Sequence, residues 1–200
     1  MLPARGVDVL VCPRRGEKIR FLGRIRYDPD MPKGLKTSSG QIIISGSLSE
    51  SAPNTFTQTQ VDLQLNVLDR EVFVVTAVDI DAYPPDALAT INTQTAASLS
   101  TTNRSALGSI ADSNVIATDN KTIRAAGFAD GGVAFAERHP EVQGSDMEYV
   151  GIIATNDFFV QVLGVGNIAA RGCQFRVWGY RAVASADTFA ALTQSELLSA

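Results

Sequence analysis

The first stretch that could do chemistry is Gly164-Val165-Gly166-Asn167-Ile168-Ala169, which follows an apolar run. It matches G-x-G-x-x-A, the relaxed dinucleotide-binding pattern. In such a site the glycine turn opens a helix whose N-terminal amides hold the pyrophosphate, and an acidic residue follows about 20 positions later. Here Gly172 and the strand-forming run 173–180 follow instead, and only 13 residues remain beyond Asp187. We therefore interpret the glycines as part of a loop of about eight residues between two strands, where they supply positive φ.

Other catalytic constellations lack partners in this sequence. The chain has one histidine, His139, and no G-x-S-x-G turn that would present a nucleophilic serine. The two cysteines, Cys12 and Cys173, stand outside any C-x-x-C pair, so no zinc knuckle or redox motif is present. They are compatible with one disulfide, but we favour two free thiols. We therefore predict a protein that is not an enzyme and that carries no cofactor.

Asp79 and Asp81 are an acidic pair placed where an apolar strand ends. Because side chains alternate along a strand, both carboxylates should face the same side. Such a pair is suited to calcium, although acidic residues at strand ends also serve solubility alone. The pair therefore keeps open a second function, a β-sandwich module that binds carbohydrate or another surface ligand in a calcium-dependent way.

Basic side chains concentrate near the N-terminus. Residues 1–36 carry nine basic and four acidic side chains, a net charge of +5, whereas the remaining residues carry −9. A basic segment on an acidic body can bind nucleic acid or dock on an acidic neighbour, although a solvated arm with a mild charge bias has the same composition. The candidate contact residues are Arg14, Arg15, Lys18, Arg20, Arg24 and Arg26. We recognise no signal peptide and no stretch near the roughly 18 apolar residues of a membrane span, so we expect no membrane partner.

Most of the chain has the two-residue period of β-strands. Strands are expected at 18–27, 41–45, 61–67, 72–80, 149–154, 158–163 and 174–183. The small polar residues of 86–148 favour a pair of extended strands or long loops. Helix is expected at 185–198, with Asp187 as its cap, and in one short segment at 84–89.

The last expected strand has two different faces. Phe175 and Val177 point to one side of the strand, whereas Arg176, Trp178 and Tyr180 point to the other. That other face combines arginine, tryptophan and tyrosine, which buried subunit contacts favour. With one residue of the terminal helix, the candidate contact residues are Arg176, Trp178, Tyr180 and Phe189. The alternative is that the aromatic residues pack under the C-terminal helix of the same copy.

Short strands, frequent turns and little helix together indicate an all-β protein, an antiparallel β-sandwich of the jelly-roll type. An immunoglobulin-like sandwich fits less well, because the Cys…Trp…Cys spacing of those domains is absent. We divide the chain into a basic N-terminal arm (1–40), the sandwich (41–184) and a short C-terminal helix or tail (185–200).

The closing stretch DFFVQVLGVGNIAARGCQFRVWGYRAVASADTF resembles the end of small virion structural proteins with a single jelly roll, and the resemblance is specific over residues 149–190. The resemblance implies a capsid subunit or capsid-decorating protein that self-assembles into a shell. Its partners would be other virion proteins, and its location would be the virion, which is assembled in the host cytoplasm. The arm departs from the family pattern, because its basic residues alternate with apolar ones. It therefore suits pairing with a neighbouring subunit as a strand, beside the alternative of genome contact.

Overall fold

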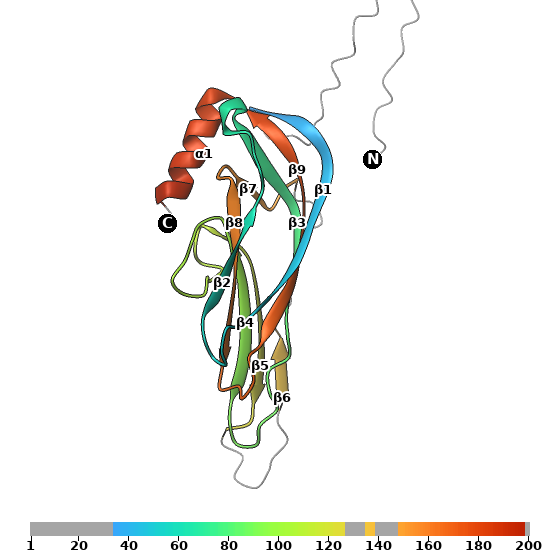
Figure 1. Cartoon of the computed structure of the whole chain (residues 1–200), viewed down its shortest axis with the longest axis vertical. Helices are drawn as coiled ribbons and strands as arrows, with labels where there is room; N and C mark the ends of the chain where they lie inside the picture. Colours follow the sequence, from blue (N-terminus) through green and yellow to red (C-terminus); the bar gives the residue numbers. More distant parts are fainter. Residues whose placement is uncertain (1–33, 127–134, 139–147, 199–200) are drawn as a thin grey trace, which may run out of the picture.

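The computed structural model describes residues 34–126, 135–138 and 148–198, which form two antiparallel sheets packed face to face and one helix (Figure 1). The first sheet contains β1 (Leu35–Ser49), β9 (Gly172–Ala184), β3 (Glu71–Ala82) and β7 (Gly151–Ile153), in this order. The second contains β2 (Thr57–Asp62), β8 (Asp157–Val165), β4 (Thr93–Ser100), β5 (Val115–Arg124) and β6 (Phe135–Arg138). A 3₁₀ turn, η1 (Val67–Asp69), precedes β3, and the helix α1 (Ala186–Leu198) follows β9.

The strand order is that of a jelly roll. The first strand pairs with the last, β1 with β9, and β2 pairs with β8, so successive strands alternate between the sheets until β4 and β5. Strands that neighbour each other in space are therefore far apart in the sequence, as in two nested Greek keys. This order confirms the predicted antiparallel sandwich of jelly-roll type with a C-terminal helix. β1 begins at Leu35, within the segment assigned to the arm, and residues 1–33 lie outside the described residues.

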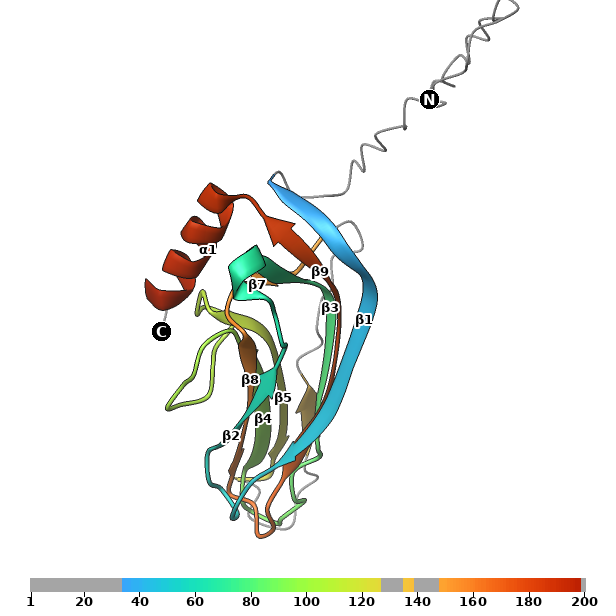
Figure 2. The ribbon, with the colours of Figure 1, turned by 45° about the horizontal axis from the view of Figure 1, so that its top comes forward.

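The core lies between the sheets and consists of the inward-facing half of each strand. Phe158 of β8 meets Phe175 of β9 edge to face, with ring centroids 6.1 Å apart. The other large, fully buried members are Phe73, Ile80, Leu99, Ile153, Val75, Val160, Val162 and Val177. The continuous apolar run predicted at 72–80 is explained by burial on both faces, because Val72 and Val74 face a second apolar cluster beneath α1. Figure 2 shows α1 beside the end of the sandwich where β9 finishes.

The glycine stretch is a strand connection, as predicted. β8 ends at Val165, and β9 begins at Gly172, so residues 166–171 form the loop. Gly166 has φ +70°, and a Cβ there would lie 2.6 Å from the carbonyl oxygen of Asn92. Both the left-handed backbone and the close approach require glycine. The extended pair predicted within 86–148 is also present, as β4 and β5.

Three predictions about elements were wrong. The strand expected at 61–67 ends at Asp62, because Gln64 has φ +53° and the amides of Leu63 and Leu65 bond instead to Asn156. Leu63 and Leu65 are nevertheless buried, which is why the sequence alternates there. The short helix expected at 84–89 is irregular, and Ser185 caps α1 in place of Asp187, its Oγ accepting from the amide of Thr188 at 3.2 Å.

Candidate functional site

The candidate contact residues of β9 lie on the outer face of the first sheet. Phe175 and Val177 are buried toward the core, whereas Arg176 is exposed and Trp178 is half-buried. Trp178 lies opposite Ile43 of β1 on one side and Ala77 of β3 on the other. The face predicted from the alternation of the sequence is therefore present, and it extends over three neighbouring strands.

The helix α1 covers only one end of this outer face. Tyr180 and Phe189 pack against the same small cluster, which includes Val74 and Ala182. Tyr180 of β9 therefore packs under the helix of the same copy, which was the alternative to a subunit contact, and Phe189 is one of the helix residues that cover this cluster. Sequence reasoning grouped them with Trp178 because it could not tell how far along the strand the helix reaches.

Trp178 and its neighbours lie beyond the helix. The guanidinium carbon of Arg176 lies 5.8 Å from the centroid of the Trp178 ring, a cation–π arrangement. Ile43, directly opposite Trp178, is 59% exposed. This group of Ile43, Arg176 and Trp178, called the outer-face patch below, therefore presents an aliphatic, an aromatic and a cationic side chain on a regular sheet.

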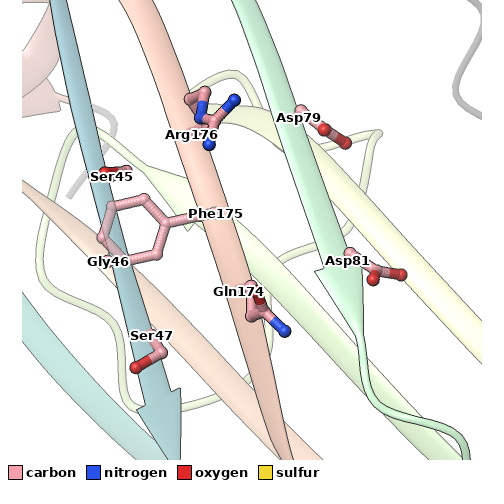
Figure 3. Close-up of a pocket in the computed structure, with 8 residues that line it drawn as sticks. All are labelled: Ser45, Gly46, Ser47, Asp79, Asp81, Gln174, Phe175 and Arg176. Carbon is pink, nitrogen blue, oxygen red and sulfur yellow. The ribbon is translucent and has the colours of Figure 1, made fainter.

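A polar hollow of about 460 Å³ adjoins the outer-face patch (Figure 3). β1, β9 and β3 supply its lining, which consists of Ser45, Gly46, Ser47, Gln174, Phe175, Arg176, Asp79 and Asp81. Asp79 and Asp81 project to the same side of β3, as expected from their spacing. Asp81 forms an ion pair with Lys121 of β5, so one of the two carboxylates already has a cationic partner. Among the described residues, no three His, Cys, Asp or Glu side chains are grouped closely enough to hold a metal ion.

At the opposite end from α1, three loops are joined by buried polar side chains. The carboxylate of Glu50, in the β1–β2 loop, accepts hydrogen bonds from the amides of Gly164 at 2.6 Å and Arg171 at 2.8 Å. Asn167, in the β8–β9 loop, accepts from the amide of Asp86 at 2.9 Å and donates to the carbonyl of Gln94 at 2.7 Å. These bonds fix the loops against one another, so this end of the sandwich is rigid.

Asp86 completes this arrangement from the β3–β4 loop. Its carboxylate accepts from the amides of Ile168 and Ala169, and it forms an ion pair with Arg171. No sequence pattern predicts these contacts. Glu50 lies 121 positions from its partner Arg171, and Asp86 lies 82 positions from its partner Ile168. An acidic residue close to proline is ordinary in a loop, and only the jelly-roll topology brings these loops together.

The loop between β4 and β5 lies over part of the outer face of the second sheet, where the amide of Gly108 donates to the hydroxyl of Ser98 at 3.0 Å. Gln161 of β8 is fully buried, accepting from Ser98 at 2.8 Å and donating to Ser100 at 2.7 Å. Arg104 holds the covering loop in place through Asn114 at 2.6 Å and Asp112 at 2.8 Å. The serine and threonine side chains of this region therefore form a buried hydrogen-bond network. This network belongs to the second sheet, whereas the outer-face patch lies on the first.

Several sequence predictions fall on residues that the structure does not describe. These are the basic contact residues Arg14, Arg15, Lys18, Arg20, Arg24 and Arg26, together with Cys12 and His139. Cys173 is a free thiol in the core, and burial raises its pKa to about 12. It is therefore protonated and unreactive at neutral pH.

Neither comparison with known proteins assigns the chain to a group. A scan against models of protein families finds no match, and a search of curated proteins finds none. Within the part of the chain that the structure describes, no helix is long and apolar enough to cross a membrane. The functional conclusion therefore depends on the geometry described above.

Proposed function

We propose that this chain is a structural protein that assembles with copies of itself, as a jelly-roll capsid subunit or a capsid-decorating protein of a virion. The observation that carries the proposal is the outer-face patch. Ile43 and Trp178 stand opposite each other on a regular sheet, beyond the reach of α1, with Arg176 over the indole ring. Tryptophan and arginine are the side chains that contribute most to binding when a partner removes them from water.

Rigidity supports the same function. Contacts between identical subunits gain affinity when little conformational entropy is lost on binding. The outer-face patch lies on strands, and the hydrogen bonds of Glu50, Asn167 and Asp86 fix the loops at the far end. The jelly-roll topology is shared by viral shell proteins and by unrelated binding proteins, so it supports the proposal only as an analogy.

Replacing Trp178 by alanine tests the role of the outer-face patch. Loss of an interface tryptophan typically costs about 2–4 kcal/mol of association, a decrease in affinity of roughly 30-fold or more. Because Trp178 is only half-buried, we expect the free energy of unfolding of the monomer to fall by about 1 kcal/mol or less. Mass photometry would measure assembly, and urea denaturation would measure stability.

The matched control is Ile110→Ser, which removes an apolar side chain that is 88% exposed on the loop covering the other sheet. This variant should assemble like the wild type. If both variants assemble equally well, or if Trp178→Ala loses stability and assembly to the same degree, the outer-face patch is not the contact surface.

A second candidate function is a binding module for carbohydrate or another polar surface ligand. The hollow beside Trp178 favours it, because Asp79, Gln174 and Arg176 supply donors and acceptors next to an aromatic ring. The calcium-dependent form of this function predicts that calcium raises the melting temperature and that a chelator lowers it. A melting temperature that is the same with calcium and with chelator would contradict calcium binding. A glycan array would then test directly whether the hollow binds carbohydrate.

A further inference from the structure

One lysine side chain connects the two sheets at the end of β3. Lys121 and Asp119 lie on the inward side of β5, whereas Asp81 lies near the end of β3 in the facing sheet. β7 pairs with β3 only at 73–75, so among the described strands β3 is the edge of its sheet at Asp81. Lys121 reaches this edge, where its Nζ donates to a carboxylate oxygen of Asp81 and to the carbonyl of Ala82.

A second carboxylate lies beside this pair and is shielded from water. The side chain of Asp119 is only 1% exposed, and its Oδ2 lies 3.9 Å from Nζ of Lys121. Oδ2 also accepts from the amide of Ala82 at 2.8 Å, which holds the carboxylate in place. The other oxygen, Oδ1, is buried and has no hydrogen-bond partner among the described residues. Native proteins rarely keep such an atom, and a role in proton transfer is one reason to keep it.

An ordinary ion pair explains only part of this arrangement. Asp81 alone would neutralise Lys121, so charge balance does not require a buried Asp119 beside them. Thr95 of β4 lies directly opposite Lys121, and its hydroxyl is also buried without a hydrogen-bond partner in the described part of the chain. The inner face of the second sheet therefore places two polar side chains with unused hydrogen-bonding atoms next to the lysine.

We propose that Lys121 and Asp81 form an isopeptide bond, a covalent amide between the two side chains, and that Asp119 carries the protons. Nζ of Lys121 attacks Cγ of Asp81, so that an Nζ–Cγ bond forms and one Cγ–O bond breaks. The ammonium group loses two protons in all, and Asp119 transfers them to the departing oxygen, which leaves as water. Nothing is oxidised or reduced, and the step needs no further reactant.

The surroundings of the pair suit this reaction. The fold holds the amine against the carboxyl group, which converts an encounter between two groups into a step within one molecule. The Lys121 side chain is 18% exposed and that of Asp81 is 51% exposed, so the amine is shielded while the released water can reach solvent. The nitrogen keeps one hydrogen in the product, and the carbonyl of Ala82 already accepts from this nitrogen. The bond would close a loop of 40 positions and tie the two sheets together.

Mass spectrometry of the denatured full-length chain tests the proposal, because an ion pair does not survive denaturation. We expect the wild-type chain to be lighter than its sequence by the mass of one water. Trypsin cuts after lysine and arginine, so Asp81 and Lys121 fall in different peptides of an unlinked chain. In the linked chain we expect 71–104 joined to 105–124, with no cut after Lys121, since its amine is then part of an amide.

Three variants assign the roles, with circular dichroism as the check that each one folds. Lys121→Arg retains the charge but removes the amine, and it should have the full mass of its sequence. Lys36→Arg is the matched control on an exposed lysine of β1, and it should lose one water like the wild type. Asp119→Asn keeps the size of the side chain but removes its carboxylate. It should slow the appearance of the lighter chain at least about tenfold, measured over time after purification.

The result that would overturn the proposal is a wild-type chain at its full sequence mass after days of incubation, with separate peptides for Asp81 and Lys121. A loss of water that persists in Lys121→Arg would overturn it too, because the water would then come from elsewhere in the chain. An unchanged rate in Asp119→Asn would contradict the role of Asp119. These measurements are made on denatured single chains, so their outcome is independent of self-assembly and of the proposed function.

Discussion

At the residue scale, burial decides the chemistry of the titratable side chains. Cys173 has a pKa of about 12 because the core disfavours its thiolate. Glu196 of α1 is also buried, and its carboxylate accepts from the amides of Ala154 and Thr155, each at 2.9 Å. These two bonds attach the end of the helix to the turn between β7 and β8.

Glu196 gives a prediction for the pH dependence of stability. Its pKa is raised in the folded protein, mainly by burial, while the bonds from Ala154 and Thr155 oppose the shift and the charge of Asp157 adds to it. The folded state therefore binds a proton more readily than the unfolded state, so this group's contribution to stability rises as pH falls. The change occurs between the raised pKa and the ordinary pKa of glutamate.

Urea denaturation of the wild type and Glu196→Gln from pH 7 to pH 4.5 would measure this contribution. The glutamine variant has no titration at this position, so other carboxylates cancel in the comparison. We expect the wild type to gain stability relative to the variant as the pH decreases. A relative loss would mean that the two amide bonds to the ionised carboxylate outweigh its desolvation.

Individual contacts were predictable only where they followed from local periodicity. Alternation along 174–183 correctly separated Phe175 and Val177 from Arg176 and Trp178. The partners of Glu50, Asp86 and Glu196 could not be predicted, because they lie about 40 to 120 residues away and depend on which loops the topology brings together.

At the scale of elements, the two-residue period predicted most of the strands, and local backbone conformation explains the exceptions. In 61–67 the apolar residues Leu63 and Leu65 are buried, as the alternation predicts, but the left-handed backbone at Gln64 ends the strand. The segment 84–89 has helix-compatible residues, yet its Asp86 amide and carboxylate are engaged by the β8–β9 loop. In both places, long-range hydrogen bonds override a local preference.

Gly179 gives a prediction for the packing of β9. A Cβ at this position would lie 2.4 Å from the carbonyl oxygen of Val74 and 2.6 Å from the ring of Phe73. Gly179→Ala should therefore lower the free energy of unfolding by about 1–3 kcal/mol, the usual cost of overpacking.

Gly40→Ala is the matched control, because a Cβ there meets nothing within 4 Å. It should change stability by no more than about 0.5 kcal/mol. Equal stability of the two variants in urea would contradict the close approach of β9 and β3 at Gly179.

At the scale of the whole molecule, composition and strand spacing predicted a sandwich of jelly-roll type, but not which strands would pair. That choice depends on contacts between strands that are far apart in the sequence, such as β1 with β9 and β2 with β8. Because β1 pairs with the last strand, an edge of Gln41–Ser49 is left open and α1 is placed over one end of the outer face. The half-buried position of Trp178 and the exposed position of Ile43 are consequences of this arrangement.

The central claim is that the chain assembles with itself, and negative-stain imaging of the full-length protein with its native mass tests it most directly. The same measurement on a protein lacking residues 1–36 would show whether the arm connects the subunits. We predict closed particles or defined rings for the full-length chain and their loss on truncation. A monomer in both samples, across the concentrations at which shells form, would contradict the account.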